Sequence, residues 1–269
     1  MNVLVLSPYA PWPPYGGGTM RIYQLVRGIA AVHDVTCVTF VANASAMDEL
    51  RAHLPNVDVY PVVGPARRSL PQRAWQMVTS ALPDMALRNH DVPFQQQLHD
   101  ILRTHPFDVA LLFSIEMAPY MHTVHQYGIP CVFDEFNAEY VIQQRAALTD
   151  IRHPHRWHAA VYSFVQWQKL RHFETQMVQR AARVTVVSAE DAATLRNLAP
   201  AIQPVVIPNG VDTTYFDAAA VAATAYPRPR PWAGPWEDAP GMLRVRRVAR
   251  GGRTGLSGVR DCPWARRRC

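Results

Sequence analysis

Residues 2–30 read NVLVLSPYAPWPPYGGGTMRIYQLVRGIA, and the fold prediction starts from this stretch. Its first six residues form a Val/Leu-rich run with the length and composition of a buried strand. A loop rich in proline and aromatic residues follows, and three consecutive glycines lead into residues 19–33, where apolar side chains recur at helical spacing. The stretch therefore predicts a strand, a turn and a helix, which is the first half of a βαβ unit.

The same alternation continues along the chain and predicts an α/β fold. Longer amphipathic segments, at residues 46–54, 92–105, 114–128 and 188–198, separate short apolar runs that are typical of buried strands. Because strands that alternate with helices form parallel sheets, we expect a Rossmann-like, doubly wound domain over residues 1–217. The further strands are expected at residues 34–41, 57–63, 107–114, 129–136, 183–188 and 204–208.

The C-terminal part of the chain has a different composition. Residues 226–269 contain 11 Arg, 6 Gly and 6 Pro and carry a charge of +8, whereas the 225 residues before them carry −2. Such a segment buries too little apolar surface to fold, so we expect residues 218–269 to form a disordered basic tail. Two origins stay open: a native tail that contacts nucleic acid or membrane, or a GC-rich gene translated in a shifted frame.

The compartment is expected to be the cytoplasm. The first residues lack the basic region and long apolar segment of a secretory signal, and the longest apolar run, residues 109–113 and the two that follow, is far too short to span a membrane. The four cysteines show neither a disulfide framework nor metal-ligand spacing. Peripheral contact with the inner face of the membrane is compatible with this expectation.

The glycine loop, Gly16, Gly17 and Gly18, is the first candidate site. It follows the first strand at the sheet edge where doubly wound folds bind ligands. Glycines allow a positive φ and remove the Cβ that would block a ligand, and the following helix start favours an anion. A diphosphate or a sugar hydroxyl suits this position; the alternative is a tight turn without a ligand. The GxGxxG pattern and an acid after the second strand are both missing, which disfavours nicotinamide cofactors.

A second candidate site is the sequence VFDEFNAEY at residues 132–140, where a strand ends and a helix begins. Its polar residues are expected to face the same sheet edge as the glycine loop. They are suited to holding sugar hydroxyls or to acting as a base, and the alternative is an ordinary cluster that caps the helix. These residues are Asp134, Glu135, Asn137 and Glu139.

Two segments interrupt the simple alternation. Residues 64–92 mix arginines with aromatic and apolar residues, which fits either a membrane-surface segment or a solvated connection. The solvated connection is favoured. Residues 153–182 predict one long helix, and its stripe of Trp157, Val161, Phe164 and Trp167 is expected to pack on the domain. The alternative is a lid or a helix that contacts the acceptor. The HxHxxH spacing at residues 153–158 does not fit a metal site.

The sequence VVIPNGVDTTYF, residues 205–216, is the most specific motif. With it, the chain resembles the N-terminal half of retaining glycosyltransferases of family 4, which have the two-domain GT-B architecture. The resemblance covers residues 1 to about 217 and implies a nucleotide-sugar as co-substrate. No further cofactor and no metal are expected. The resemblance rests on five motifs in the family's order: PYAPWPPYGGGTMRIYQLVRGIA, FDVALLF, VFDEFNAEY, VVSAEDAATLRNL and VIPNGVDTTYF.

The resemblance also implies roles for individual residues. The glycine loop would approach the diphosphate of the nucleotide-sugar, and Arg21 would reach into the cleft from the first helical turn. Asn137 and Glu139 would border the acceptor, while Asn209 and Gly210 would mark the hinge to a second domain. Many relatives have a histidine near the end of the corresponding strand, but this chain has none there, so no catalytic residue is assigned.

The chain departs from the family after residue 217, where the donor-binding domain would begin. We therefore expect a transferase half that is inactive alone, and whose intact form transfers a sugar to an envelope or exopolysaccharide acceptor. The expected partners are a sugar or lipid-linked glycan acceptor, an anionic membrane surface and a separate donor-domain chain; nucleic acid is disfavoured. The alternative is a non-catalytic module that binds an acceptor or a membrane surface.

Overall fold

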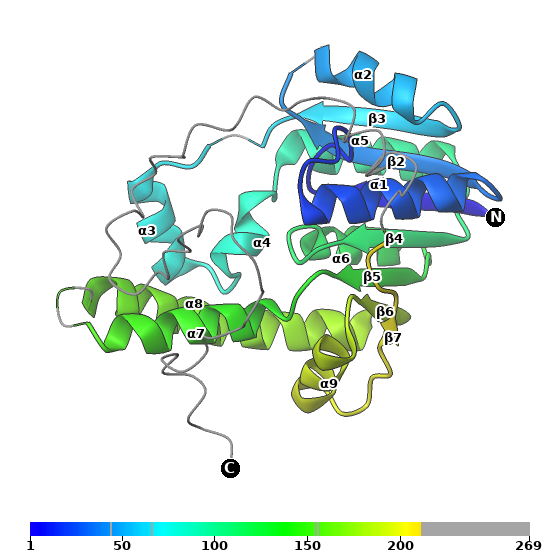
Figure 1. Ribbon diagram of the computed structural model, residues 1–269. Helices are drawn as coiled ribbons and strands as arrows, with labels where there is room; N and C mark the ends of the chain where they lie inside the picture. Colours follow the sequence, from blue (N-terminus) through cyan, green and yellow to red (C-terminus); the bar gives the residue numbers. More distant parts are fainter. Residues whose placement is uncertain (44, 66, 154, 156, 211–269) are drawn as a thin grey trace, which may run out of the picture. The chain divides into compact units, whose positions relative to one another are not determined.

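The computed structural model describes residues 1–43, 45–65, 67–153, 155 and 157–210. The described chain carries a seven-stranded parallel sheet with strand order β3-β2-β1-β4-β5-β6-β7 (Figure 1). This order confirms the predicted Rossmann-like fold, and each of the seven predicted runs forms a strand. The strands are β1 (Asn2–Ser7), β2 (Asp34–Val41), β3 (Val57–Val63), β4 (Val109–Phe113), β5 (Cys131–Glu135), β6 (Arg183–Val186) and β7 (Val205–Val206).

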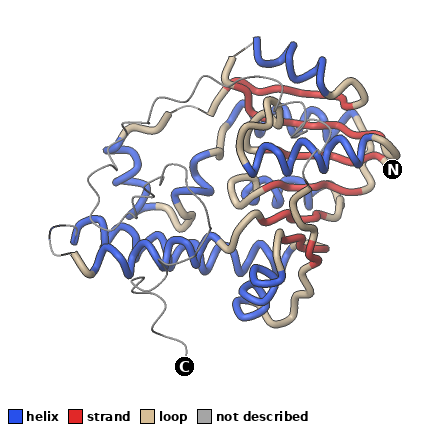
Figure 2. Tube along the Cα trace, in the orientation of Figure 1, coloured by secondary structure: helices blue, strands red, loops and turns tan. Residues whose placement is uncertain are grey.

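Helices cover both faces of the sheet (Figure 2). Alternate residues of each strand supply the two cores: Leu4 and Leu6 pack on one side of β1, and Val3 and Val5 on the other. Helices α1 (Gly17–Ala30) and α2 (Ser45–His53) cover the Val3 face. The opposite face packs against α5 (Val92–Thr104), α6 (Met121–Gln126), α8 (Trp157–Arg180) and α9 (Ala189–Leu198).

The remaining helices extend the Leu4 side of the domain. They are α3 (Leu70–Thr79), α4 (Asp84–Arg88), the 3₁₀ turn η1 (Ala118–Tyr120) and α7 (Glu139–Ile151), which runs beside α8 (Figure 1). The helix predicted at residues 114–128 is therefore too long at its start. Ser114 has a φ of 68°, which helices exclude, so the chain makes a loop before η1 and α6.

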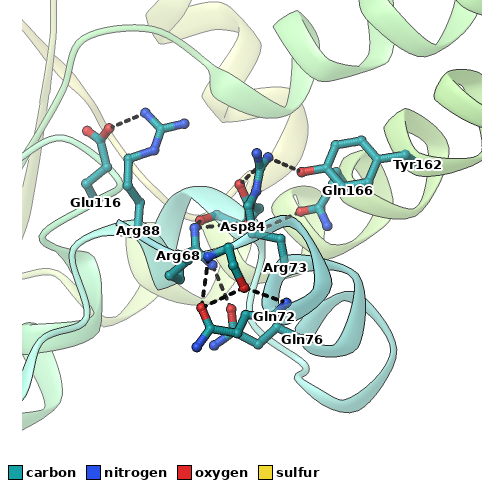
Figure 3. A network of polar contacts seen from close by, with 10 residues as sticks. Arg68, Gln72, Arg73, Gln76, Asp84, Arg88, Glu116, Tyr162 and Gln166 are labelled. Carbon is teal, nitrogen blue, oxygen red and sulfur yellow. Dashed lines mark hydrogen bonds and ion pairs between the residues drawn. The ribbon is translucent and has the colours of Figure 1, made fainter. Parts of the chain in front are cut away.

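Residues 64–92 form a connection that polar contacts join to α8 (Figure 3). Arg68 and Arg73 both form ion pairs with Asp84, at 3.0 and 3.1 Å. The side chain of Gln166 accepts a hydrogen bond from the Asp84 backbone N–H, at 2.8 Å, and Arg73 donates to the Tyr162 hydroxyl, at 3.1 Å. The arginines of this segment that bind Asp84 therefore do not form a free basic surface.

Lys169, the sole lysine of the chain, strengthens the contact between residues 64–92 and α8. The Lys169 ammonium on α8 donates hydrogen bonds to the carbonyl oxygens of Met77, at 2.5 Å, and Ser80, at 2.6 Å. Burial lowers the pKa of this ammonium. The contacts hold the C-terminal end of α3 against α8.

Three of the four residues in the apolar stripe of the long helix are exposed, so the expectation that the stripe packs on the domain is wrong for them; the fourth, Trp167, is half-buried. Trp157, Val161 and Phe164 are 69%, 52% and 46% exposed. The buried face of α8 lies elsewhere on the helix and includes Leu170 and Phe173. The apolar side chains of the first turns are displaced from this face because small and polar residues, Ala160, Ser163 and Gln166, occupy it there.

Residues 211–269 lie outside the described residues, and so do the predicted tail and the end of the predicted domain. None of the described helices combines the length and the apolar character that crossing a bilayer demands.

Two phenylalanines of α8 test this assignment of its faces. Phe173→Ala is expected to lower the free energy of unfolding by about 3 kcal/mol, because it leaves a cavity in the core. Phe164→Ala is expected to cost less than about 1 kcal/mol, because its side chain is half exposed. Urea unfolding of both variants measures the difference. Equal losses would contradict the orientation of α8.

Candidate functional site

A buried ion pair joins α1 to the C-terminal half of the sheet. The Arg21 guanidinium is 3% exposed and binds both carboxylate oxygens of Asp134, with Nε–Oδ2 at 2.7 Å and Nη2–Oδ1 at 2.6 Å. Thr185 of β6 donates a further hydrogen bond to Asp134. Arg21 Nη1 donates to the Ile207 carbonyl at 2.6 Å and to Asn209 Oδ1 at 3.1 Å. Charge and hydrogen-bonding capacity are thus satisfied inside the fold.

A second buried pair consists of two acids, Glu135 at the end of β5 and Glu174 on α8, which are 1% and 0% exposed. The backbone N–H of Tyr140 donates to Glu174 Oε2 at 2.9 Å. Among the described residues, no N–H or O–H group donates to the other three carboxyl oxygens of the pair. A proton shared between the two acids is the hydrogen bond that remains available to them. Burial raises the pKa of Glu174 to about 8, and burial followed by the charge of Glu174 raises the pKa of Glu135 well above its ordinary value.

The glycine loop touches the end of β5, as the sequence predicts. A Cβ added to Gly18 would overlap the Tyr9 hydroxyl and lie 3.2 Å from the Phe136 ring, whereas one added to Gly17 would meet open space. None of the three glycines has a positive φ, so the turn itself does not require glycine there. Gly18 is needed for the close approach of Tyr9 and Phe136.

Polar side chains gather where β1, β4 and β5 end, and we name them the strand-end cluster. The Ser114 hydroxyl donates to Glu116 Oε2 at 2.6 Å, and Arg88 donates to Glu116 Oε1 at 3.3 Å (Figure 3 shows the Arg88 contact). Asn137 donates to Glu139 Oε1 at 3.4 Å. The cluster comprises Tyr9, Arg88, Ser114, Glu116, Asn137 and Glu139.

The electrostatics show that these side chains share one environment. Burial raises the pKa of Tyr9 to about 12, and the charges of Glu116 and Glu139 add to the rise. The pKa of Glu139 is also raised, mainly by burial and further by Glu116, while Asn137 and Arg88 oppose the shift. Tyr9 therefore remains a neutral phenol, a hydrogen-bond donor beside two carboxyl acceptors.

Ser114 directly follows β4 and has an unusual backbone conformation. Its side chain is 5% exposed, its φ of 68° is rare for a residue other than glycine, and its backbone N–H binds the Asp134 carbonyl at 2.8 Å. Strained backbone of this kind is concentrated at functional sites. The conformation aims the Ser114 hydroxyl at Glu116.

The predicted site residues separate into two groups. Gly16, Gly17, Gly18, Asn137 and Glu139 lie at the accessible strand ends, and the binding roles implied for them stay predictions. The second group consists of three buried side chains whose partners lie inside the fold. Because Arg21 is one of them, it does not reach into a cleft, as the resemblance had implied. The inward-facing side chains are Arg21, Asp134 and Glu135, while Asn209 and the exposed Gly210 end the described chain beside Arg21.

Sequence reasoning missed four members of the cluster. Tyr9 is within the loop that drew attention to the glycines, and Ser114 and Glu116 follow the fourth strand directly, so position after a strand was an available signal. Arg88 had no such signal, because it is brought to the cluster by a long-range contact. The buried Asn89 side chain donates to the Pro8 carbonyl at 2.9 Å and fixes the end of α4 there.

The chemistry open to the cluster is the recognition of hydroxyl groups. Carboxylates accept hydrogen bonds from hydroxyls, whereas the phenol, amide and guanidinium groups donate them. Among the described residues, no group of three or more histidine, cysteine or acidic side chains is arranged to hold a metal ion.

Comparison with known protein families identifies one family whose model matches most of this chain. The family model described as Glycosyltransferase Family 4 matches residues 15–215. A comparison with curated protein sequences gives no match.

A solved structure shows the same fold at low sequence identity, and a second one aligns with a lower score. A sucrose-phosphate synthase from Thermosynechococcus elongatus aligns with a TM-score of 0.55 and 13% identity, over 80% of this chain and 49% of that chain. The UGT2 protein of Phytolacca americana, complexed with UDP-2-fluoro-glucose and pterostilbene, aligns with a TM-score of 0.48 and 13% identity, over 78% and 54%. The chain thus spans about half the length of these structures.

The Glu135–Glu174 pair predicts a pH dependence of stability. The folded protein retains a proton up to about pH 8 that the unfolded chain releases near its ordinary pKa of 4.5, so stability should fall as pH rises between these values. Glu174→Gln is expected to flatten this fall and to be more stable than the wild type at about pH 8. Urea unfolding across this range measures it, and parallel pH profiles for the two proteins would refute the shared proton.

Proposed function

Because the chain belongs to glycosyltransferase family 4, we propose that its strand-end cluster binds the acceptor of a sugar transfer from a nucleotide-sugar. The observation that carries the proposal is the convergence of hydroxyl-binding groups from three strand ends. Glu116 and Glu139 accept hydrogen bonds from acceptor hydroxyls, and Tyr9 and Asn137 donate to acceptor oxygens. This is the sheet edge at which doubly wound folds bind their ligands.

The transfer itself needs a donor positioned against the acceptor. An acceptor oxygen forms a bond to the anomeric carbon, the bond from that carbon to the diphosphate breaks, and the hydroxyl proton passes to the departing diphosphate. The proposed place of the diphosphate is the glycine loop, because open space surrounds Gly17 and the first N–H groups of α1 precede its first helical hydrogen bond, from Met20 to Gly16.

The donor-binding groups are proposed to lie on a further domain, in a longer chain or on a separate one. This chain spans about half of the solved structures it resembles, and its described residues form one sheet domain. We propose a sugar or lipid-linked glycan of the cell envelope, or an exopolysaccharide, as the acceptor, and the cytoplasmic face of the membrane as the place of reaction. No cofactor beyond the nucleotide-sugar is proposed.

The test has two parts. The purified 269-residue chain is expected to turn over no nucleotide-sugar, and to bind simple sugars weakly in saturation-transfer NMR. Glu116→Gln is expected to weaken sugar binding about tenfold, because a charge-assisted hydrogen bond is lost. Glu190→Gln is the matched control, since Glu190 is an exposed acid on α9.

Each part has its contradicting result. Release of nucleoside diphosphate by the chain alone would show that a separate donor domain is unnecessary. Equal sugar binding by the wild type and Glu116→Gln, with retained folding, would remove the acceptor role of the strand-end cluster.

A second candidate function is a module that binds a membrane surface, and the exposed stripe of α8 favours it. Trp157, Val161 and Phe164 project from this helix, and Asp150 is the only acid among residues 141–173. That acid is 7% exposed, whereas Arg145 and Arg152 are exposed, so the helix pair α7–α8 presents apolar and basic groups together. Anionic lipid surfaces attract this combination.

Vesicle binding separates this candidate from the first. The double variant Trp157→Gln/Phe164→Gln is expected to bind phosphatidylglycerol vesicles at least tenfold more weakly than the wild type in about 1 M salt, where charge effects are screened. Trp75→Gln on α3 is the control, because Trp75 is 70% exposed on another helix. Equal weakening by both variants, or no binding at all in high salt, would exclude docking through α8.

A further inference from the structure

A cavity of about 510 Å³ lies between α6 and the C-terminal half of α8. It opens on the sheet face opposite α1, and its lining residues include none of the strand-end cluster. The volume is within the range of pockets that hold small organic ligands. Neither the proposed acceptor site nor the α8 stripe accounts for it.

The rim of this cavity carries basic side chains. His122 and His125 of α6, Arg180 of α8 and His90 from the segment before α5 all line it, and no acidic side chain does. Within the described chain, Arg180 makes no ion pair. A guanidinium and three imidazoles thus converge on one cavity without a neutralising carboxylate.

The floor of the cavity is apolar. Met121, Phe173 and Met177 are 1%, 6% and 5% exposed, and Leu82, Ala118 and Pro119 add further apolar lining, while Gln176 is a neutral polar group beside them. Burial lowers the pKa of His125, and the positive charges of Arg180 and His122 lower it further. An anion placed among these groups would reverse the electrostatic part of that effect.

The positions of Arg180 and His125 at helix C-termini explain part of the basic character of the rim. Arg180 and His125 each lie in the last turn of a helix, where the helix dipole favours a cation. The dipole does not explain His90, which belongs to no helix, or the combination of an acid-free rim with an apolar floor. That combination matches a ligand with an anionic head and an apolar body.

We propose that this cavity binds an organic anion, a phosphate ester or a carboxylate, carried on an apolar group. Arg180 and the imidazoles hold the anionic head, and the Met121, Phe173 and Met177 side chains cover the apolar body. The proposal goes beyond acceptor binding and does not depend on it.

Octyl phosphate and octyl sulfate, both below micellar concentration, are the probes, and isothermal titration of the full chain is the measurement. Arg180→Gln is expected to weaken octyl phosphate binding about tenfold, because a charge-assisted hydrogen bond to the head is lost. Arg171→Gln is the matched control, since Arg171 is an exposed arginine of the same helix outside the cavity. It should bind like the wild type, and so should Glu116→Gln.

A second readout follows the imidazoles by NMR. Octyl sulfate, whose charge is fixed, is expected to raise the pKa of His125, and Arg180→Gln should reduce that rise. Octanol, which has the apolar chain without the anion, should bind at least tenfold more weakly than octyl phosphate. The variants replace exposed or half-buried groups, so circular dichroism should show an unchanged fold.

Three results would overturn the proposal: no saturable binding of octyl phosphate, equal binding of octanol, or equal weakening by Arg180→Gln and Arg171→Gln. The last would mean attraction to basic surface in general, including the arginine-rich C-terminal residues. Phosphatidic acid vesicles identify the source of the ligand. Vesicle binding that depends on Arg180 indicates a lipid headgroup, and binding of octyl phosphate alone indicates a soluble ester; both support the site.

Discussion

The Arg21–Asp134 ion pair is the constraint on which the C-terminal half of the sheet depends. It is buried, so losing either partner would leave an uncompensated charge, at a cost of about 3–5 kcal/mol. The pair also sets the path of the chain: Arg21 holds the Ile207 carbonyl, and β7 has only two residues paired with β6. The short strand β7 is therefore positioned by a side chain of α1.

Burial decides which polar residues at the strand ends remain open to a ligand. Side chains inside the sheet are used to hold it together, and the two acids at the end of β5, Asp134 and Glu135, point to opposite cores where each finds an internal partner. The polar residues that follow the strands lie at the edge of the sheet, outside its two cores. Glu116 and Glu139 follow β4 and β5, and together with Tyr9 they stay half-buried at the edge of the sheet.

The sequence predicts the sheet well because its signals are local. Each strand is a short apolar run between polar boundaries, and the start of α9 is equally local, since the Ser188 hydroxyl accepts a hydrogen bond from the Asp191 N–H at 3.1 Å. Side-chain direction depends on distant contacts and is predicted less well. Arg21 looked like a cleft residue because nothing near it in sequence reveals Asp134. The stripe at Trp157 looked buried because helical spacing identifies an apolar face but not what covers it.

The hydrogen bonds that hold α3 against α8 have a consequence for chemical labelling. Lys169 is the only lysine in the chain, and its ammonium is held by two backbone carbonyls with a lowered pKa. Reagents that modify amines have one side-chain target in this protein, beside the N-terminal amine, and reaction at Lys169 requires the ammonium to leave both carbonyls. The rate of lysine modification thus reports how often α3 separates from α8, without any engineered probe.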